Sequence, residues 1–161
     1  MEISRYGNPD LKISQRRLPH WELPGSIYFI TFITWDRLEL SPPARDIVLS
    51  ACRYFDGDRY TLYAAVVMPD HVHLLLQPQP QANGEPWPLS KIIHSLKSYT
   101  AKQISTVMMH HGTLWMPERY DRIIRDAAEF QATWQYIQEN PLRSGLCTQQ
   151  EDYPFVWQRQ D

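Results

Sequence analysis

Two histidines separated by one residue begin an apolar run at residues 71–76. In an extended strand the side chains alternate between faces, so His71 and His73 project from one side while Val72 and Leu74 face the other. Two imidazoles about 6–7 Å apart along a strand can lean together onto one cation. The alternative is a pair of polar residues on the solvated face of a half-buried strand, and the pattern by itself leaves both interpretations open.

A second polar pair lies on the longest predicted helix, Leu89–His111, in which apolar residues recur at helical spacing. Tyr99 and Gln103 are one turn apart and continue the line of the helix surface that carries Ile92 and Leu96. Because this line should face the sheet, its phenol and amide could approach the two histidines. The alternative is a tyrosine at the edge of the core, with its hydroxyl in water and the glutamine as its partner.

Together these four side chains suggest phosphoryl-transfer chemistry. Two imidazoles and an amide oxygen form an open site for Mg²⁺ or Mn²⁺, and such an ion polarises a phosphoryl oxygen. A tyrosine hydroxyl beside the ion could attack phosphorus and form a covalent phosphotyrosine, although a phenol with a pKa of about 10 needs the metal or a base for this. The phosphotyrosyl ester keeps the phosphodiester character of the bond that it replaces, so the cut strand could be rejoined without ATP.

The elements that must position these residues alternate between strands and helices. Beside the long helix we expect a strand at 27–37, a helix at 44–55, a hairpin of Tyr60–Met68 and His71–Pro78, a strand at 120–124 and a helix at 127–139. Pro69-Asp70 is the expected hairpin turn, and Asn140-Pro141 is expected to end the last helix. This order predicts a layered α+β domain with an antiparallel sheet and the long helix on one face.

Composition limits the class of protein. The 161 residues, 43% hydrophobic and 21% charged, predict one domain over 1–161, with an irregular arm at 1–26 and a flexible loop at 78–88. No apolar run reaches the roughly 18–20 residues that span a bilayer, and the N-terminus lacks the apolar core of a signal peptide. The two cysteines imply no disulfide framework, so we expect a cytoplasmic protein that does not bind membranes.

The net charge of −2 argues mildly against a nucleic-acid-binding protein, but positive charge is concentrated in one segment. Residues 89–125 contain six lysines or arginines and two acidic residues, while both flanking regions are net negative. This segment could hold a phosphate chain, or it could be a solvated helix face. On charge and placement alone, the tentative phosphate contacts are Arg16, Arg17, Lys97, Lys102, Arg119 and Arg125.

Several segments resemble one family. Met-Pro-Asp-His-Val-His-Leu-Leu-Leu at 68–76 is similar to the histidine–hydrophobe–histidine motif of the single-tyrosine HUH transposases, and Ser-Leu-Lys-Ser-Tyr-Thr-Ala-Lys-Gln at 95–103 resembles their nucleophile helix. A bacterial branch, the REP-associated tyrosine transposases, is similar at residues 28–32, 119–125, 136–146 and 152–154. The resemblance runs from about Pro24 to Trp157, nearly the whole chain.

The resemblance implies a ferredoxin-like sandwich, in which helices pack mainly on one face of an antiparallel sheet. It implies Tyr99 as the nucleophile, and His71, His73 and Gln103 as ligands of Mg²⁺ or Mn²⁺. The substrate would be single-stranded DNA, nicked at or near a palindromic REP hairpin, with the 5′ phosphate held on tyrosine and a 3′ hydroxyl released. It further implies a bacterial, nucleoid-associated transposase that acts as a monomer or a homodimer.

Two other functions remain open at this point. A catalytically silent protein that binds REP hairpins would keep the fold without turnover, and its binding would fall steeply with salt. A small metal-dependent hydrolase would use activated water, and no strand would become linked to the protein.

Overall fold

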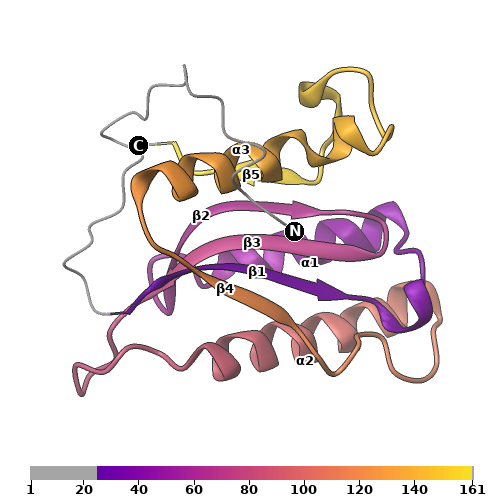
Figure 1. Cartoon of the computed structure of the whole chain (residues 1–161). Coiled ribbons are helices and arrows are strands. Elements are labelled where there is room, and N and C mark those ends of the chain that lie inside the picture. The colour runs from indigo at the N-terminus through magenta and orange to yellow at the C-terminus, as the bar shows by residue number, and fades with distance from the viewer. Residues whose placement is uncertain (1–24, 161) are drawn as a thin grey trace.

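The computed structural model describes residues 25–160. Their strands form one five-stranded antiparallel sheet, and helices pack on both of its faces (Figure 1). The strands lie in the order β4-β1-β3-β2-β5, so β3 is central and carries both histidines of the motif. Their bounds are Ile27–Ile33 for β1, Tyr60–Val67 for β2, His71–Pro78 for β3, Tyr120–Ile124 for β4 and Val156–Gln158 for β5.

The helices cover both faces of this sheet. Their bounds are Pro42–Tyr54 for α1, Leu89–Met108 for α2 and Ala127–Arg143 for α3, with short 3₁₀ turns at Trp35–Arg37 and Gln150–Asp152. Two of them, α1 and α2, pack on one face, and α3 packs on the other (Figure 1). The predicted fold class, a ferredoxin-like α+β sandwich, is confirmed.

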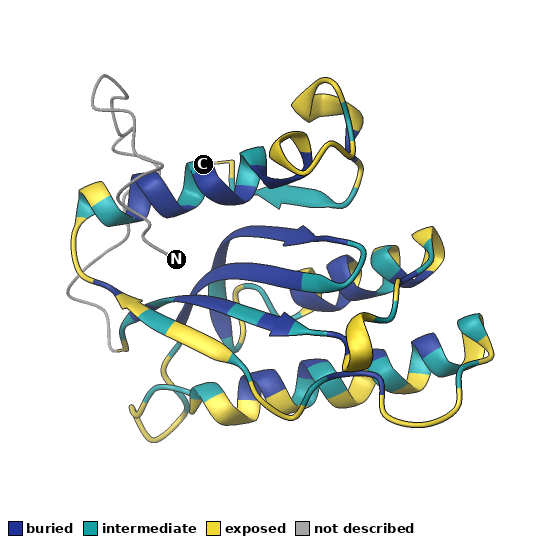
Figure 2. Ribbon diagram, turned by 45° about the vertical axis from the view of Figure 1, so that its right-hand side comes forward, coloured by how far each residue is buried: buried dark blue, intermediate teal, exposed yellow. Residues whose placement is uncertain are grey.

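Alternation along β3 divides the interior into two cores. Val72, Leu74 and Leu76 are fully buried against apolar residues of α1 and α2. Leu75 points the other way and joins Phe29 in a second core beneath α3. Figure 2 shows that β2 and β3 are buried along most of their length, while much of the edge strand β4 is exposed. His71 and His73 alternate along β3 with Val72 and Leu74, as Leu75 does, so their side chains lie on the face that α3 covers.

The ends of the elements follow their local sequence signals. Ser41 caps α1 by accepting a hydrogen bond from the backbone N–H of Ala44, with prolines in the first turn. Asp126 caps α3 in the same way, through the N–H of Glu129. The turn at Pro69-Asp70 is closed by the N–H of Met68, which donates to the carbonyl of His71 at 2.8 Å.

Several predicted boundaries are wrong. The first strand ends at Ile33 rather than at residue 37, and the long helix ends at Met108 rather than at His111. The last helix, α3, does not end at Asn140-Pro141 but continues through Pro141 to Arg143. Proline forfeits one helical hydrogen bond, and the helix resumes because the Ser144 N–H donates to the Asn140 carbonyl at 3.0 Å. Asn140 is therefore held in helical geometry. The short strand β5 was not predicted, because its three residues leave no periodic signal.

Within residues 25–160, no helix is both long and apolar enough to cross a membrane. The polar loop after β3 is internally hydrogen bonded, with the Gln81 N–H donating to the Glu85 carbonyl at 2.7 Å. Its flexibility stays a prediction.

Candidate functional site

The two motif histidines lie side by side on the α3 face of β3. Their ring centroids are 4.8 Å apart and the ring planes meet at 72°. His73 is 3% exposed and stacks on Phe29 of β1, with centroids 5.3 Å apart, whereas His71 is only partly buried at the start of the strand. The alternation predicted from the sequence therefore brings both imidazoles to one place.

Each imidazole is oriented through its Nδ1 atom. The Oγ1 atom of Thr31 lies 2.8 Å from Nδ1 of His73, and a carboxylate oxygen of Asp70 lies 2.7 Å from Nδ1 of His71. Arg37 in turn approaches the second carboxylate oxygen of Asp70 at 3.4 Å. Hydrogen bonds at Nδ1 fix ring orientation and direct Nε2 toward a ligand, as partners of metal-binding histidines do.

Burial keeps His73 neutral. Removal of the imidazole from water, with a smaller contribution from neighbouring His71, lowers the pKa of His73 from 6.5 to about 3. At neutral pH this ring therefore carries a lone pair on one nitrogen, which is the form that coordinates a metal.

A tyrosine of α3 packs directly on this pair. The ring of Tyr136 lies 5.4 Å from the ring of His73 at 63°, and 6.1 Å from that of Phe29. Asn140 follows one helical turn later, on the same side of α3. Its side-chain oxygen Oδ1 is buried and has no hydrogen-bond partner in the described part of the chain. The site thus combines two imidazoles and a phenol, and a buried amide oxygen lies one helical turn from the phenol.

These residues fit a divalent metal. Among residues 25–160, no three His, Cys, Asp or Glu side chains gather as ligands, so a third ligand from these residues would be of another type. The orphaned Oδ1 of Asn140 meets this requirement, because hard cations such as Mg²⁺ accept amide oxygens and leaving a buried polar atom unpaired is costly.

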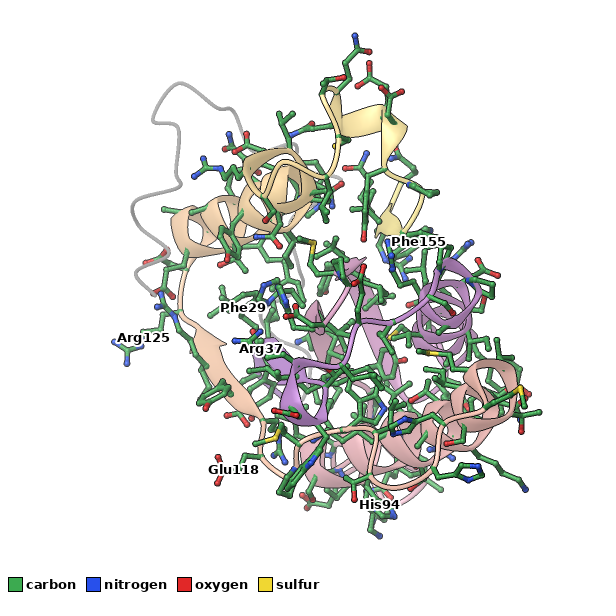
Figure 3. The ribbon with its side chains drawn as sticks, turned by 90° about the vertical axis from the view of Figure 1, so that its right-hand side faces the viewer. Phe29, Arg37, His94, Glu118, Arg125 and Phe155 are labelled. Carbon is green, nitrogen blue, oxygen red and sulfur yellow. The ribbon has the colours of Figure 1, made fainter. Side chains whose placement is uncertain are left out.

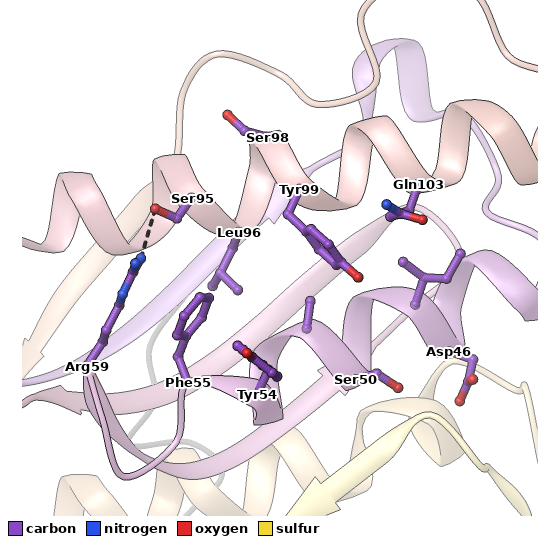
Figure 4. A pocket seen from close by; sticks show the side chains of 12 residues that line it. Asp46, Ser50, Tyr54, Phe55, Arg59, Ser95, Leu96, Ser98, Tyr99 and Gln103 are labelled. Carbon is purple, nitrogen blue, oxygen red and sulfur yellow. Dashed lines mark hydrogen bonds between the residues drawn. The ribbon is translucent and has the colours of Figure 1, made fainter.

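The expected positions of Tyr99 and Gln103 are wrong. Both lie on α2, across the sheet from the histidines, where they line a cavity of about 730 Å³ that α2 shares with α1. Tyr99 is 54% exposed and its side chain points toward α1 (Figure 4). The reason is that Ile92 and Leu96 bury their side chains against the other core, with Leu74, so their line of α2 never meets the histidine face.

The sequence contains a second pair of the same kind, on the helix that does cover the histidines. Tyr136 and Asn140 have the same one-turn spacing of phenol and amide as Tyr99 and Gln103, and they lie in a segment, 136–146, that carries the family resemblance. The premature end predicted for this helix obscured the spacing, because Asn140 was assigned to its terminus.

The basic residues predicted from charge separate into different roles. Lys97 is committed to structure, since its Nζ donates to the carbonyls of Met116 and Glu118 at 2.9 and 3.2 Å, and burial lowers its pKa. Arg119 pairs with Asp121 at 3.0 Å. The exposed remainder comprises Lys102 on α2 and Arg125, which projects outward after β4 (Figure 3), while Arg16 and Arg17 lie outside the described residues.

Comparison with known proteins identifies a family. The family model for IS200-like transposases matches residues 42–140, which include both histidines, Tyr99 and Tyr136. A Haemophilus influenzae protein named as a REP-associated tyrosine transposase is 23% identical over 145 residues, covering 81% of this chain and 78% of that protein.

Two solved structures share the fold. One, a REP-associated tyrosine transposase bound to a REP hairpin, has a TM-score of 0.65 and 23% identity, and the match covers 89% of this chain and 82% of that one. The other, a Deinococcus radiodurans protein described as a transposase, has a TM-score of 0.53 and 23% identity over 76% of this chain and 95% of that one. On its sequence and its fold, this chain belongs to the family of IS200-like transposases, which are DNA-processing enzymes.

Proposed function

We propose that the chain is a metal-dependent single-stranded DNA endonuclease and strand transferase in which Tyr136 is the nucleophile. The observation that carries the proposal is the packing of Tyr136 on His73, with the unpaired amide oxygen of Asn140 one turn away. This arrangement places a phenol beside the residues best suited to hold a cation.

In the proposed reaction the Tyr136 oxygen attacks a backbone phosphorus of the DNA. An O–P bond to tyrosine forms and the bond from phosphorus to the 3′ oxygen breaks, which leaves a 5′-phosphotyrosine and a free 3′ hydroxyl. The phenol loses a proton and the departing 3′ oxygen gains one, so charge and atoms balance. The reverse attack by a 3′ hydroxyl rejoins DNA and releases Tyr136.

His71, His73 and Asn140 would hold the metal, Mg²⁺ or Mn²⁺. The ion would polarise an oxygen of the phosphate whose phosphorus is attacked, and it would favour the ionised form of the Tyr136 phenol. Thr31 and Asp70 hold the two imidazoles in place, and burial keeps His73 unprotonated.

A solved relative supports the proposed substrate class. A similar fold has been solved with a REP hairpin bound, which supports a palindromic hairpin in single-stranded DNA as the partner here. Arg119 and Arg125 lie at the two ends of β4, whose residues Tyr120 and Arg122 share the histidine face through their pairing with Thr31 and Phe29. Phosphate contacts along this edge would position the DNA without reading its sequence.

The proposal is tested by trapping the covalent complex. Purified protein is incubated with Mn²⁺ and a labelled single-stranded hairpin, and complexes that survive denaturation are resolved by electrophoresis. The wild-type protein forms such a complex and releases a 3′-hydroxyl fragment, while Tyr136→Phe forms neither, because the attacking oxygen is gone.

Tyr99→Phe is the matched control and still forms the linked complex, since its hydroxyl lies across the sheet. A complex that persists in Tyr136→Phe and disappears in Tyr99→Phe would reverse the assignment. Hairpin binding without nicking under any divalent ion would instead identify a silent REP-binding protein, and nicking without a linked strand would identify a hydrolase.

A further inference from the structure

A long depression follows α2 on the face of the molecule opposite the histidines. Its main part is the cavity of about 730 Å³ between α1 and α2 (Figure 4). A second depression of about 480 Å³ shares Arg59 and Ser95 with the first and extends along α2 to Lys91 and Trp87. We call the two together the α1–α2 groove.

Two tyrosines face each other across the groove. Tyr54 on α1 is 79% exposed, and Tyr99 on α2 is 54% exposed. Side chains this exposed contribute little to the core, yet their rings lie on opposite walls of one hollow. Exposed aromatic rings beside basic residues are the usual platforms on which unpaired bases stack.

Arg59 lies where the two depressions join, and two aromatic rings and a hydroxyl contact its guanidinium. The guanidinium of Arg59 lies 4.1 Å from the ring centroid of Phe55 and 4.8 Å from that of Trp87. Its Nη1 donates to the hydroxyl of Ser95 at 3.0 Å (Figure 4). A guanidinium that is already ordered loses little entropy on binding, and its planar fork matches a phosphate.

The charge of the groove favours a polyanion. No acidic residue occurs in the 20 residues of α2, and Asp46 is the only carboxylate among the residues lining the two depressions. Five arginines elsewhere in the described chain pair with carboxylates, namely Arg37, Arg119, Arg122, Arg143 and Arg159. No ion pair between described residues involves Arg59, Lys91 or Lys102, the last of which follows Tyr99 by one turn.

We propose that the α1–α2 groove binds a single-stranded nucleic-acid segment, with bases stacked on Tyr54 and Tyr99. Its phosphates would be held by Arg59 and Lys91 of the lining and by Lys102, which continues along α2 the line of Ser95 and Ser98. Hydroxyl groups in its lining, such as that of Ser95, are further phosphate donors. The site lies across the sheet from Tyr136 and performs no chemistry. It gives the protein a second contact with a strand, independent of the proposed cleavage.

The test measures binding of an unstructured probe without a metal. Fluorescence anisotropy with a labelled 12-residue oligothymidylate in EDTA requires neither a hairpin nor cleavage, so its outcome is separate from that of the covalent trapping. The double variant Tyr54→Ala/Tyr99→Ala should bind at least about tenfold more weakly, because base stacking is lost twice. Met109→Ala, which removes an 83% exposed side chain outside the groove, should bind as the wild type does.

Two further measurements separate the groove from other surfaces. Lys91→Gln and Lys102→Gln should each reduce the slope of log affinity against log salt by about 0.7, the value for one phosphate contact on a single strand. A 5-iodouridine probe should crosslink to peptides containing Tyr54 or Tyr99. Wild-type affinity in the double variant, or crosslinks confined to β3 and α3, would overturn the proposal and leave the groove to a protein partner. Thermal denaturation of each variant checks that it is folded.

Discussion

The two faces of the sheet differ in the kinds of side chain that are buried against them. The face under α1 and α2 is covered by buried apolar side chains, and polar groups buried there are paired: the Trp115 indole N–H donates to the hydroxyl of Thr100, and the Tyr60 hydroxyl donates to the carbonyl of Cys52. The face under α3 contains an imidazole pair, a phenol and an amide in its interior. Among the described residues, the buried side-chain polar atoms that lack a partner all lie on α3, in Gln131, Thr133, Gln135, Gln138 and Asn140.

Buried polar atoms normally find partners, and each exception needs an explanation. A face built only for stability would not accumulate such atoms, because each costs about 1–3 kcal/mol relative to a satisfied group. The contrast is that these polar groups under α1 and α2 are paired, whereas α3 carries buried polar atoms that have no partner among the described residues. Functional sites are where consistency between local sequence and packing is expected to fail.

The largest effect should come from the apolar face. Leu74 is fully buried between β3 and the layer of α1 and α2, so Leu74→Ala should lower the free energy of unfolding by about 3 kcal/mol through lost transfer energy and a residual cavity. Urea denaturation followed by circular dichroism measures this loss. Leu142→Ala, at a 39% exposed position on α3, is the control and should change stability by less than about 0.5 kcal/mol. Equal losses would show that Leu74 contributes no more to stability than an exposed leucine does.

The second effect tests the α3 face as a metal site. Saturating Mn²⁺ should raise the midpoint of thermal unfolding, since a ligand at 100 times its dissociation constant stabilises the folded state by about 2.7 kcal/mol. His71→Ala should abolish the shift because one of three proposed ligands is gone. His111→Ala, an exposed histidine beyond the end of α2, should retain it. A shift that survives in His71→Ala would place the ion elsewhere.

Most of the architecture could be predicted because it rests on strong local patterns. The alternation in Tyr60–Pro78 identified the hairpin, and the helical periodicity after Leu89 identified α2. The strand at Tyr120–Ile124 was predicted with its exact bounds. Only three residues form β5, and their pairing with β2 depends on a chain reversal that no local pattern specifies.

The histidine half of the candidate site could be predicted from the sequence. The phenol and amide could not, because such a pair one turn apart occurs on both α2 and α3. Which helix covers the histidines depends on the parity of β3: the strongly apolar stripe of α2 must take the face of Val72 and Leu74, and this leaves the histidines to α3. Tyr99 was assigned to the wrong face because the apolar line on which it lies was assumed to face the histidines. Tyr136 meets His73 because the histidines lie on the face of β3 that α3 covers; its distance from them along the sequence plays no part.

The third effect is a pH dependence that only the α3 face should show. The pKa of His73 is lowered to about 3 in the folded protein against 6.5 for the free group, so the unfolded chain binds the extra proton between these values. The contribution of His73 is therefore fully present above pH 6.5 and is lost as the pH falls toward 3, with a slope approaching about 1.4 kcal/mol per pH unit.

Urea denaturation in EDTA at several pH values measures this slope. His73→Leu removes the titrating group while keeping the site apolar, so the difference between the two proteins isolates the contribution of His73. Parallel curves for the two proteins would show that His73 can be protonated in the folded state without cost.

The smallest effect has the opposite sign. Asn140→Leu replaces a buried amide oxygen that has no partner within residues 25–160 by an apolar group of similar shape, so the metal-free protein should become more stable by about 1 kcal/mol. The same change should remove the stabilisation by Mn²⁺, because the third ligand is lost. Gln131→Leu is the matched control on α3, since its Nε2 is also buried without a partner, and it should gain stability while keeping the response to Mn²⁺. If Asn140→Leu kept that response, the amide would be only an unpaired group of the helix, and the two faces would differ in packing alone.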